Sequence, residues 1–253
     1  MDVGYVFLLH QKFNTAIMTW KNFFTASIGK KFTMALTGFF LITFLIVHCL
    51  INSMIFFNDN GETFNHWGFF MGDNLIIRTM EIGLFVFLLL HIIQGLMLWN
   101  QNRRARPVKY VVNNPNQNSK WYSRSMGLLG TLILLFLVLH LYHFWTPSRF
   151  GGIASIQPLE EVSLSGYNGQ EVHNLYLEMQ RVFQNLFVVI IYVLGVFSLW
   201  WHLMQGFQSA FQTFGINHKR YNPIIKAAGT IYAFVICVLF ALMPIAFYLN
   251  WIQ

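Results

Sequence analysis

Five long apolar runs constrain this chain more than any other feature of its sequence. They cover approximately residues 30–57, 75–100, 122–145, 182–211 and 224–250. A helix needs about 20 mostly apolar residues to cross the hydrocarbon core of a bilayer. Each run is continuous rather than alternating, which favours helices over strands. The composition agrees, because only 10% of the residues are charged, against about 25% in an average soluble domain. The sequence therefore predicts an all-α integral membrane protein, with residues 1–253 forming a single membrane domain of five transmembrane helices.

The charges predict the orientation of these helices. Most lysines and arginines lie before the first run, between the second and third, and between the fourth and fifth, whereas nearly all acids lie in the other connections. Basic segments remain cytoplasmic, so the N-terminus is expected inside and the C-terminus outside. The outer connections are then residues 58–74, expected to be a short loop, and 147–181, expected to include a helix after Gln170 that leads into the fourth span.

Histidines inside the apolar runs are the candidate functional residues, because ionisable groups are costly within a membrane and mark function by default. The five are His48, His91, His140, His143 and His202. Counting from the flanking basic residues at about 1.5 Å per residue, His48 and His140 lie roughly 25 Å from the inner charges. His91 and His202 lie roughly 18–20 Å from the inner edge. The sequence thus predicts an outer and an inner pair.

An internal repeat supports this pairing. The first run has Met-Ala-Leu-Thr-Gly ending at Gly38, and the third has Met-Gly-Leu-Leu-Gly ending at Gly130; in both, a histidine follows ten residues after the glycine. The second and fourth runs share His-x-x-Gln-Gly, beginning at His91 and His202. The chain therefore reads as two related two-helix units plus a fifth helix, and the repeat selects His140 over His143.

Two imidazoles at one depth on different helices suit the axial positions of a haem iron. The prediction is a four-helix haem-binding bundle plus a fifth helix, with two haems. Hydrogen bonding between helices is the alternative for any single histidine, and no cysteine or carboxylate completes a zinc site with either pair. Small residues would let helix and macrocycle approach closely. These glycines are Gly38, Gly95, Gly130 and Gly206.

Two further expectations concern the surroundings of the haems. A larger residue at Gly130 is expected to lower the occupancy of the outer haem. Three basic residues near the inner helix ends, Lys30, Lys31 and Arg124, are candidates to pair with haem propionates; ordinary cytoplasmic positive charge is the alternative explanation.

The four paired histidines, the Leu-His-Leu-Tyr stretch at Leu139–Tyr142 and the His-x-x-Gln-Gly at His202 resemble a known family. It is the membrane-anchor cytochrome b subunit of succinate dehydrogenase and fumarate reductase (respiratory complex II), in its five-helix, two-haem, single-polypeptide form. The resemblance covers nearly the whole chain. It implies that His48 and His140 ligate the distal haem b, and that His91 and His202 ligate the proximal one.

The resemblance also implies partners and a place in the cell. An iron–sulfur subunit carrying a flavoprotein would dock on the cytoplasmic face of a bacterial inner membrane, and no nucleic acid would be involved. Electrons would pass through both haems to a quinone, usually menaquinone, near the distal haem; the dicarboxylate chemistry belongs to a partner subunit. One departure is Trp200, where some quinol-oxidising members carry a carboxylate. This departure favours succinate:quinone reductase over fumarate reductase.

Quinone chemistry needs a proton donor or acceptor near the ring carbonyls. The candidates on the outer side are Glu81, Glu62, His66 and His143. An ion pair with Arg78 at i, i+3 is the alternative for Glu81, solvated loop positions for Glu62 and His66, and an interfacial position beside Trp145 for His143.

Two other functions remain open at this point. The chain could be the dihaem anchor of another respiratory enzyme, of nitrate reductase or hydrogenase type, or a haem-free transporter or scaffold.

Overall fold

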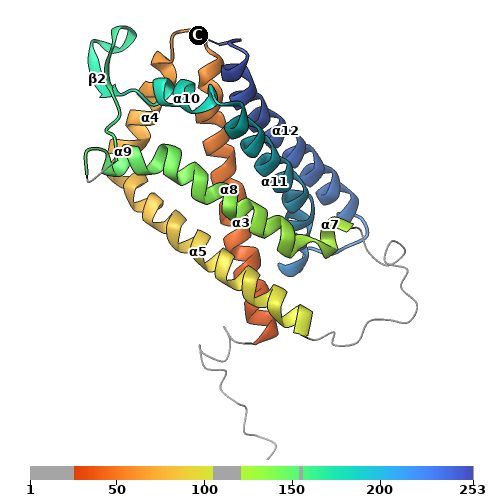
Figure 1. Cartoon of the computed structure of the whole chain (residues 1–253). Helices are drawn as coiled ribbons and strands as arrows, with labels where there is room; N and C mark the ends of the chain where they lie inside the picture. The colour runs from red at the N-terminus through yellow and green to blue at the C-terminus, as the bar shows by residue number, and fades with distance from the viewer. Residues whose placement is uncertain (1–25, 105–120, 154–155, 253) are drawn as a thin grey trace, which may run out of the picture.

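A computed structural model describes residues 26–104, 121–153 and 156–252 of the chain (Figure 1). Among these residues, five helical segments are long and apolar enough to cross a membrane, as the sequence predicts. They are Ser27–Phe56, Leu75–Arg104, Met126–Phe150, Leu186–Thr213 and Asn222–Tyr248. The chain is therefore a helical, multi-pass membrane protein by length and composition. Most of the expected basic loop 101–121 lies outside the described residues.

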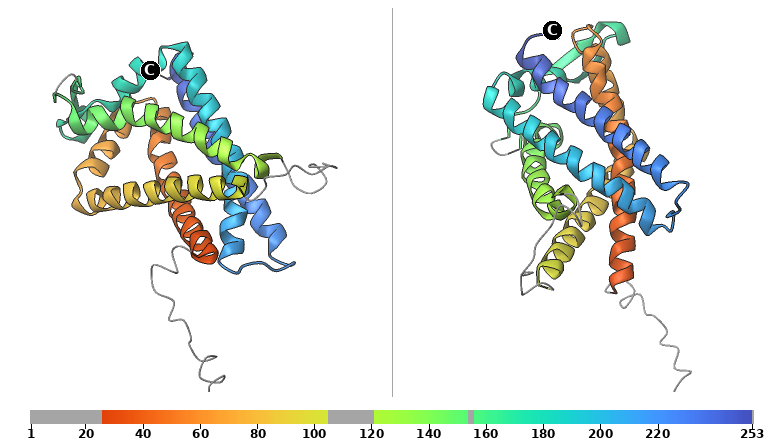
Figure 2. Two further views of the ribbon diagram at one scale, coloured as in Figure 1. Left: turned by 60° about the horizontal axis from the view of Figure 1, so that its bottom comes forward. Right: turned by 90° about the vertical axis from the view of Figure 1, so that its right-hand side faces the viewer.

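The five spans form a bundle around α3 (Ser27–Asn52). α5 (Leu75–Arg104) packs along α3, and α8 (Met126–His140) crosses in front of α3 in Figure 1 and packs mainly against α11 (Leu186–Thr213). α12 (Asn222–Tyr248) lies beside α11 (Figures 1 and 2). None of the residues of α5 is buried. A helix that buries no side chain within its own chain leaves space for lipid, a cofactor or another subunit beside it.

Close helix packing occurs where α11 and α12 meet each other and α3. A Cβ atom at Gly229 in α12 would lie 2.7 Å from the ring of Phe207 in α11. The Tyr232 hydroxyl of α12 donates a hydrogen bond of 2.8 Å to the carbonyl oxygen of Ile42 in α3. These contacts fix α11 and α12 against α3. Pro244 lies inside α12, which continues to Tyr248.

The third span changes its winding after His140. It continues as a π-helical turn, η2 (Leu141–Trp145), and then as a short α-helix, α9 (Thr146–Phe150). Single π-helical turns are rare and are frequent at functional sites.

A small layer of structure covers one end of the bundle. It contains a 3-10 turn and two helices, η1 (Ser53–Phe56), α4 (Glu62–Asp73) and α10 (Leu175–Phe183), and a hairpin of β1 (Glu161–Leu164), η3 (Ser165–Tyr167) and β2 (Gln170–His173). The two strands pair antiparallel, with Val162 opposite Val172. We call this end the capped end.

The prediction of a loop over residues 58–74 is wrong, because α4 occupies most of it. Two local features start this helix. Gly61 takes a φ of 79°, and the Asp59 carboxylate accepts hydrogen bonds from the backbone N–H groups of Gly61 and Thr63. A carboxylate that satisfies free N–H groups in this way is a helix-capping interaction.

The helix expected after Gln170 exists as α10, but it does not merge with the fourth span. The chain turns at Asn185, whose side-chain oxygen accepts a 2.9 Å hydrogen bond from the backbone N–H of Phe187. This cap begins α11 at Leu186, later than the start at 182 that the apolar run suggests. The buried Asn65 amide ties α4 to α10, donating to Asn174 Oδ1 and accepting from the backbone N–H of Tyr176.

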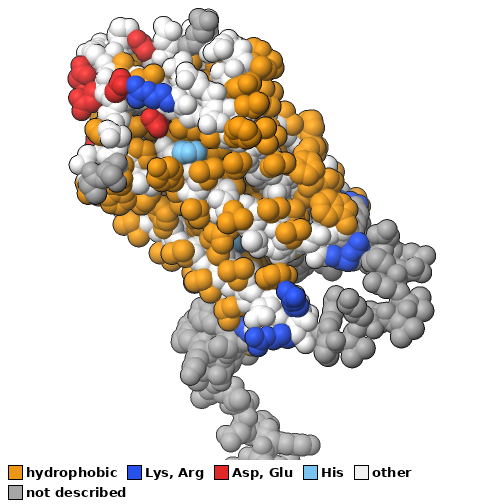
Figure 3. Space-filling view, in the orientation of Figure 1, with side chains coloured by type: hydrophobic (Ala, Val, Ile, Leu, Met, Phe, Trp, Pro, Cys, Tyr) orange, Lys and Arg blue, Asp and Glu red, His pale blue; other side chains and the backbone are white. Residues whose placement is uncertain are grey.

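The charges separate toward the two ends of the molecule. Figure 3 shows the red acidic side chains at the capped end and several blue basic side chains at the opposite end. The described basic residues of that opposite end include Lys30, Lys31, Arg103, Arg104 and Arg124. We call it the basic end.

Candidate cofactor site

The histidines that the sequence pairs by depth lie side by side in the structure. The ring centres of His48 (α3) and His140 (α8) are 5.8 Å apart, and those of His91 (α5) and His202 (α11) are 6.1 Å apart. Each pair therefore joins two different spans. We call them the capped-side pair and the central pair, respectively.

The two pairs lie at different depths in the bundle. His48 and His140 stand near the ends of their helices at the capped end, whereas His91 and His202 stand near the middle of theirs. Gly38 lies beside His91, and His48 follows it by ten residues on the same helix, about 15 Å along the axis at 1.5 Å per residue. The ten residues between the glycine and the histidine of each repeat therefore correspond to the offset between the central pair and the capped-side pair along the helix.

The glycines of the repeat belong to the central pair. A Cβ atom at Gly38 would lie 3.5 Å from His91 Cε1, and one at Gly130 would lie 3.9 Å from His202 Cε1. The expectation that Gly130 lines the outer site is therefore wrong. Its place ten residues before His140 puts it at the depth of His202 instead.

The other two glycines differ from each other. A Cβ atom at Gly95 would lie 3.4 Å from the end of the Met34 side chain. One at Gly206 would meet no atom of the described residues within 4 Å. Gly206 follows His202 by one turn, so the helix surface beside this histidine is open.

The separation of the paired rings fits a shared metal ion. A metal–imidazole nitrogen bond is about 2 Å, and the nitrogen lies about 1 Å from the ring centre, so two rings on opposite sides of one iron have centres about 6 Å apart. The observed separations of 5.8 and 6.1 Å agree with this value.

Hydrogen bonding within the pairs is incomplete. The Nδ1 atoms of His140 and His202 are buried and have no hydrogen-bond partner among the described residues. Buried polar atoms are nearly always paired, and each exception needs an explanation. The explanation that histidines only hydrogen-bond across the bundle leaves these two atoms unaccounted for.

Aromatic side chains surround the capped-side pair. The His48 ring stacks on Phe44 and contacts Phe240, while the His140 ring stacks on Phe136. Flat aromatic surfaces around the rings suit a large planar ligand such as a porphyrin.

His143 belongs to a separate contact beside the capped-side pair. Its Nδ1 lies 2.9 Å from the hydroxyl of Tyr192, and the two rings stack at 14°. Tyr192 also contacts the His140 ring at 6.1 Å between centres. Tyr192 is buried within the apolar fourth run, and nothing in its spacing distinguished it at the level of sequence.

Glu81 is held in an ion-pair cluster near the capped end. Arg149 donates to both carboxylate oxygens, from Nε at 3.1 Å and from Nη2 at 2.9 Å, and Trp145 Nε1 donates at 2.7 Å. The expected partner, Arg78, lies 3.5 Å away. Glu81 therefore ties α5 to α9. The i, i+3 spacing within one helix predicts Arg78 as its partner but cannot predict Arg149, which lies on another element.

Glu62 and His66 are residues of α4 rather than of a loop, and both contact the hairpin. The Glu62 carboxylate accepts hydrogen bonds from the Ser165 hydroxyl at 2.6 Å and from the backbone N–H of Gly166 at 2.8 Å. These bonds lower the pKa of Glu62, with the Ser165 hydroxyl as the largest cause. His66 stacks on Tyr167 and its Nδ1 lies 2.9 Å from Gln170 Oε1.

The basic candidates lie at the end of the bundle away from the capped-side pair. Lys30 Nζ donates a long hydrogen bond of 3.4 Å to Gln101 Oε1, which joins the basic ends of α3 and α5. Lys31 and Arg124 are exposed. All three are nearer in sequence depth to the central pair.

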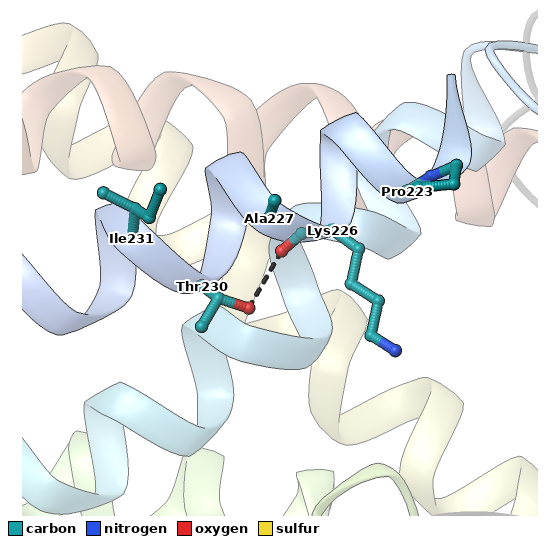
Figure 4. Close-up of a pocket in the computed structure, with 5 residues that line it drawn as sticks. All are labelled: Pro223, Lys226, Ala227, Thr230 and Ile231. Carbon is teal, nitrogen blue, oxygen red and sulfur yellow. Dashed lines mark hydrogen bonds between the residues drawn. The ribbon is translucent and has the colours of Figure 1, made fainter. Parts of the chain in front are cut away.

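Two surface grooves lie apart from the histidine pairs. One, lined by Pro223, Lys226, Ala227, Thr230 and Ile231, belongs to α12 alone (Figure 4). The other lies on α4 and β2, lined by His66, Phe69, Phe70, Asp73, Asn74 and Gln170. The first has the apolar character of a lipid-facing helix surface.

No group of three or more His, Cys, Asp or Glu side chains able to hold a metal ion occurs in the described part of the chain. The span histidines of this part stand in two pairs, one at each depth. Comparison of the chain with family models, curated proteins and solved structures gives no match.

Proposed function

We propose that this protein is a dihaem cytochrome b that anchors a respiratory enzyme to the membrane and carries electrons between its partner subunits and a quinone. One observation carries the proposal: four spans bring together two histidine pairs, 5.8 and 6.1 Å between ring centres, at two depths.

Haem b, when bound, supplies one-electron chemistry. The residues of this chain do the rest. His48 with His140, and His91 with His202, would each provide two nitrogen ligands from different helices. The roughly 15 Å offset between the pairs leads from the middle of the bundle toward the capped end. Aromatic side chains pack around the capped-side pair, where Phe44, Phe136 and Phe240 contact its rings.

The assignment to succinate:quinone oxidoreductase rests on the sequence resemblance. A histidine on each of four successive spans, with matched motifs in alternate spans, favours complex II over the nitrate reductase or hydrogenase type. In this proposal the iron–sulfur and flavoprotein subunits dock at the basic end, on the cytoplasmic side of a bacterial inner membrane. The quinone, of menaquinone type, binds toward the capped-side pair.

The first test is spectroscopic. The full chain, purified in detergent, should give a reduced-minus-oxidised spectrum of b-type haem with two haems per chain. A protein expressed with haem available that shows no such signal would be a transporter or scaffold instead.

The second test concerns the enzyme. The complex purified from native membranes should contain an iron–sulfur protein and a protein with covalently bound flavin. A molybdenum-containing subunit in their place would assign the chain to the alternative respiratory anchor.

A further inference from the structure

The two histidines of the central pair differ in one hydrogen bond. His91 Nδ1 lies 3.1 Å from the hydroxyl oxygen of Thr37, whereas His202 Nδ1 is buried without a hydrogen-bond partner among the described residues. Thr37 is 1% exposed, so water does not compete for this contact. The two halves of the repeat therefore present unequal ligands to the same site.

The direction of the Thr37–His91 hydrogen bond follows from the proposed role of His91 as a ligand. When Nε2 of a neutral imidazole binds iron, the ring proton lies on Nδ1, and Nδ1 can only donate. The Thr37 oxygen then accepts from His91. The Thr37 hydrogen has two carbonyl acceptors within reach, since Oγ1 lies 2.8 Å from the carbonyl oxygen of Thr33 and 3.1 Å from that of Met34.

The repeat explains why His202 lacks the same partner. Thr37 directly precedes Gly38, and Leu129 directly precedes Gly130. The two glycines occupy equivalent places, since each lies within 4 Å of Cε1 of one central histidine when a Cβ is added. Leu129, which is 4% exposed, thus stands where Thr37 stands in the first unit. A leucine side chain cannot accept a hydrogen bond.

We infer that Thr37 is a positioning residue that sets the redox potential of the central haem through His91. This inference rests on the proposed function. A hydrogen-bond acceptor at the ring nitrogen that does not bind the metal, here Nδ1, fixes the tautomer and orientation of a ligating histidine and raises its basicity. A more basic ligand stabilises oxidised over reduced iron, so Thr37 holds the midpoint potential of one haem below the value that two unassisted histidines would give.

Thr37→Val tests the inference, because it replaces the hydroxyl by a methyl group of similar size. The midpoint potential of one haem should rise in a spectroscopic redox titration of the full chain, while the other haem keeps its potential. Thr37→Ser restores the acceptor and should restore the potential. Thr43→Val is the matched control, since the Thr43 hydroxyl on the same helix is exposed and donates to the Phe39 carbonyl oxygen rather than contacting a histidine.

The reciprocal variant Leu129→Thr offers His202 the acceptor that it lacks, and should lower the potential of the same haem. Loss of one haem in Thr37→Val with recovery in Thr37→Ser also supports a positioning role. Unchanged potentials in both Thr37→Val and Leu129→Thr, with two haems bound, would overturn the inference alone. Absence of haem from the unmodified protein would instead overturn the proposed function.

Discussion

His140 and His143 lie one turn apart and both contact Tyr192, yet only His140 faces another histidine. His140 faces His48, whereas His143 bonds to the Tyr192 hydroxyl. We predict that His140→Ala loses half of the haem absorbance in the difference spectrum and that His143→Ala retains both haems. If only the His143 variant lost a haem, His143 would be the ligand.

Gly130 provides a second test at the scale of one residue. Gly130→Leu would place a large side chain against His202, because a Cβ alone comes within 3.9 Å of its ring. The occupancy of the central haem should fall, with that of the other haem unchanged. Gly83→Leu is the control, since a Cβ at Gly83 meets no described atom within 4 Å. Equal haem loss in both variants would mean a general folding defect.

Depth counting could pair the four histidines because each is a polar residue in an apolar background. Their neighbours could not be found in the same way. Thr37 and Tyr192 can be identified as neighbours of histidines only from the structure. Both lie in apolar runs, whose pattern predicts a membrane span but not the contacts of single residues. Arg149 is 68 residues from Glu81 along the chain, beyond any local rule for ion pairs.

At the scale of elements, Glu62 fastens the hairpin to α4. Its hydrogen bonds with Ser165 and Gly166 lower its pKa in the folded protein. Their stabilisation is therefore present above the carboxyl's unfolded pKa of about 4.3 and is lost as the pH falls through the lower folded value. Glu62→Gln should accelerate amide hydrogen exchange in β1 and β2 at neutral pH. Glu160→Gln, on the exposed approach to β1, is the comparison that should leave the β2 amides unchanged.

The Glu81–Arg149 pair joins α5 to α9 near the capped end, and no residue of α5 is buried. Hydrogen bonds to charged groups contribute about 1.5–3 kcal/mol each when they are shielded, and this pair is only partly shielded. We predict that Arg149→Leu lowers the melting temperature in detergent, at a cost of about 1–2 kcal/mol. Arg149→Lys should recover only part of this, because lysine lacks the two-pronged geometry. Equal stability of all three proteins would contradict a structural role for the pair.

The spans were predictable as elements because a membrane requires one long apolar helix for each crossing. Their ends were not. Asn185 caps the start of α11, but a hydropathy average over many residues does not detect a single polar residue. Asp59 and Gly61 start α4 in a segment whose composition predicts a loop.

At the scale of the whole molecule, the separation of charges predicts the orientation in the membrane. A membrane-impermeant maleimide should label Ser163→Cys at the capped end in intact spheroplasts, and Asn102→Cys at the basic end only after permeabilisation. The native Cys49 and Cys237 are each 2% exposed and should stay unlabelled. The reverse labelling pattern would invert the proposed orientation.

The way in which the pairs are shared between the two halves of the repeat has a consequence for biogenesis. Each half contributes one ring to each pair, so the first two spans alone complete neither site. As the ribosome delivers the chain, the capped-side pair is first assembled when the third span inserts. The central pair must wait for the fourth. The growing chain thus gains its two sites in a fixed temporal order, the capped-side pair before the central one. This order holds even though Gly38 and Gly130, which lie beside the central pair, precede His48 and His140 in the chain.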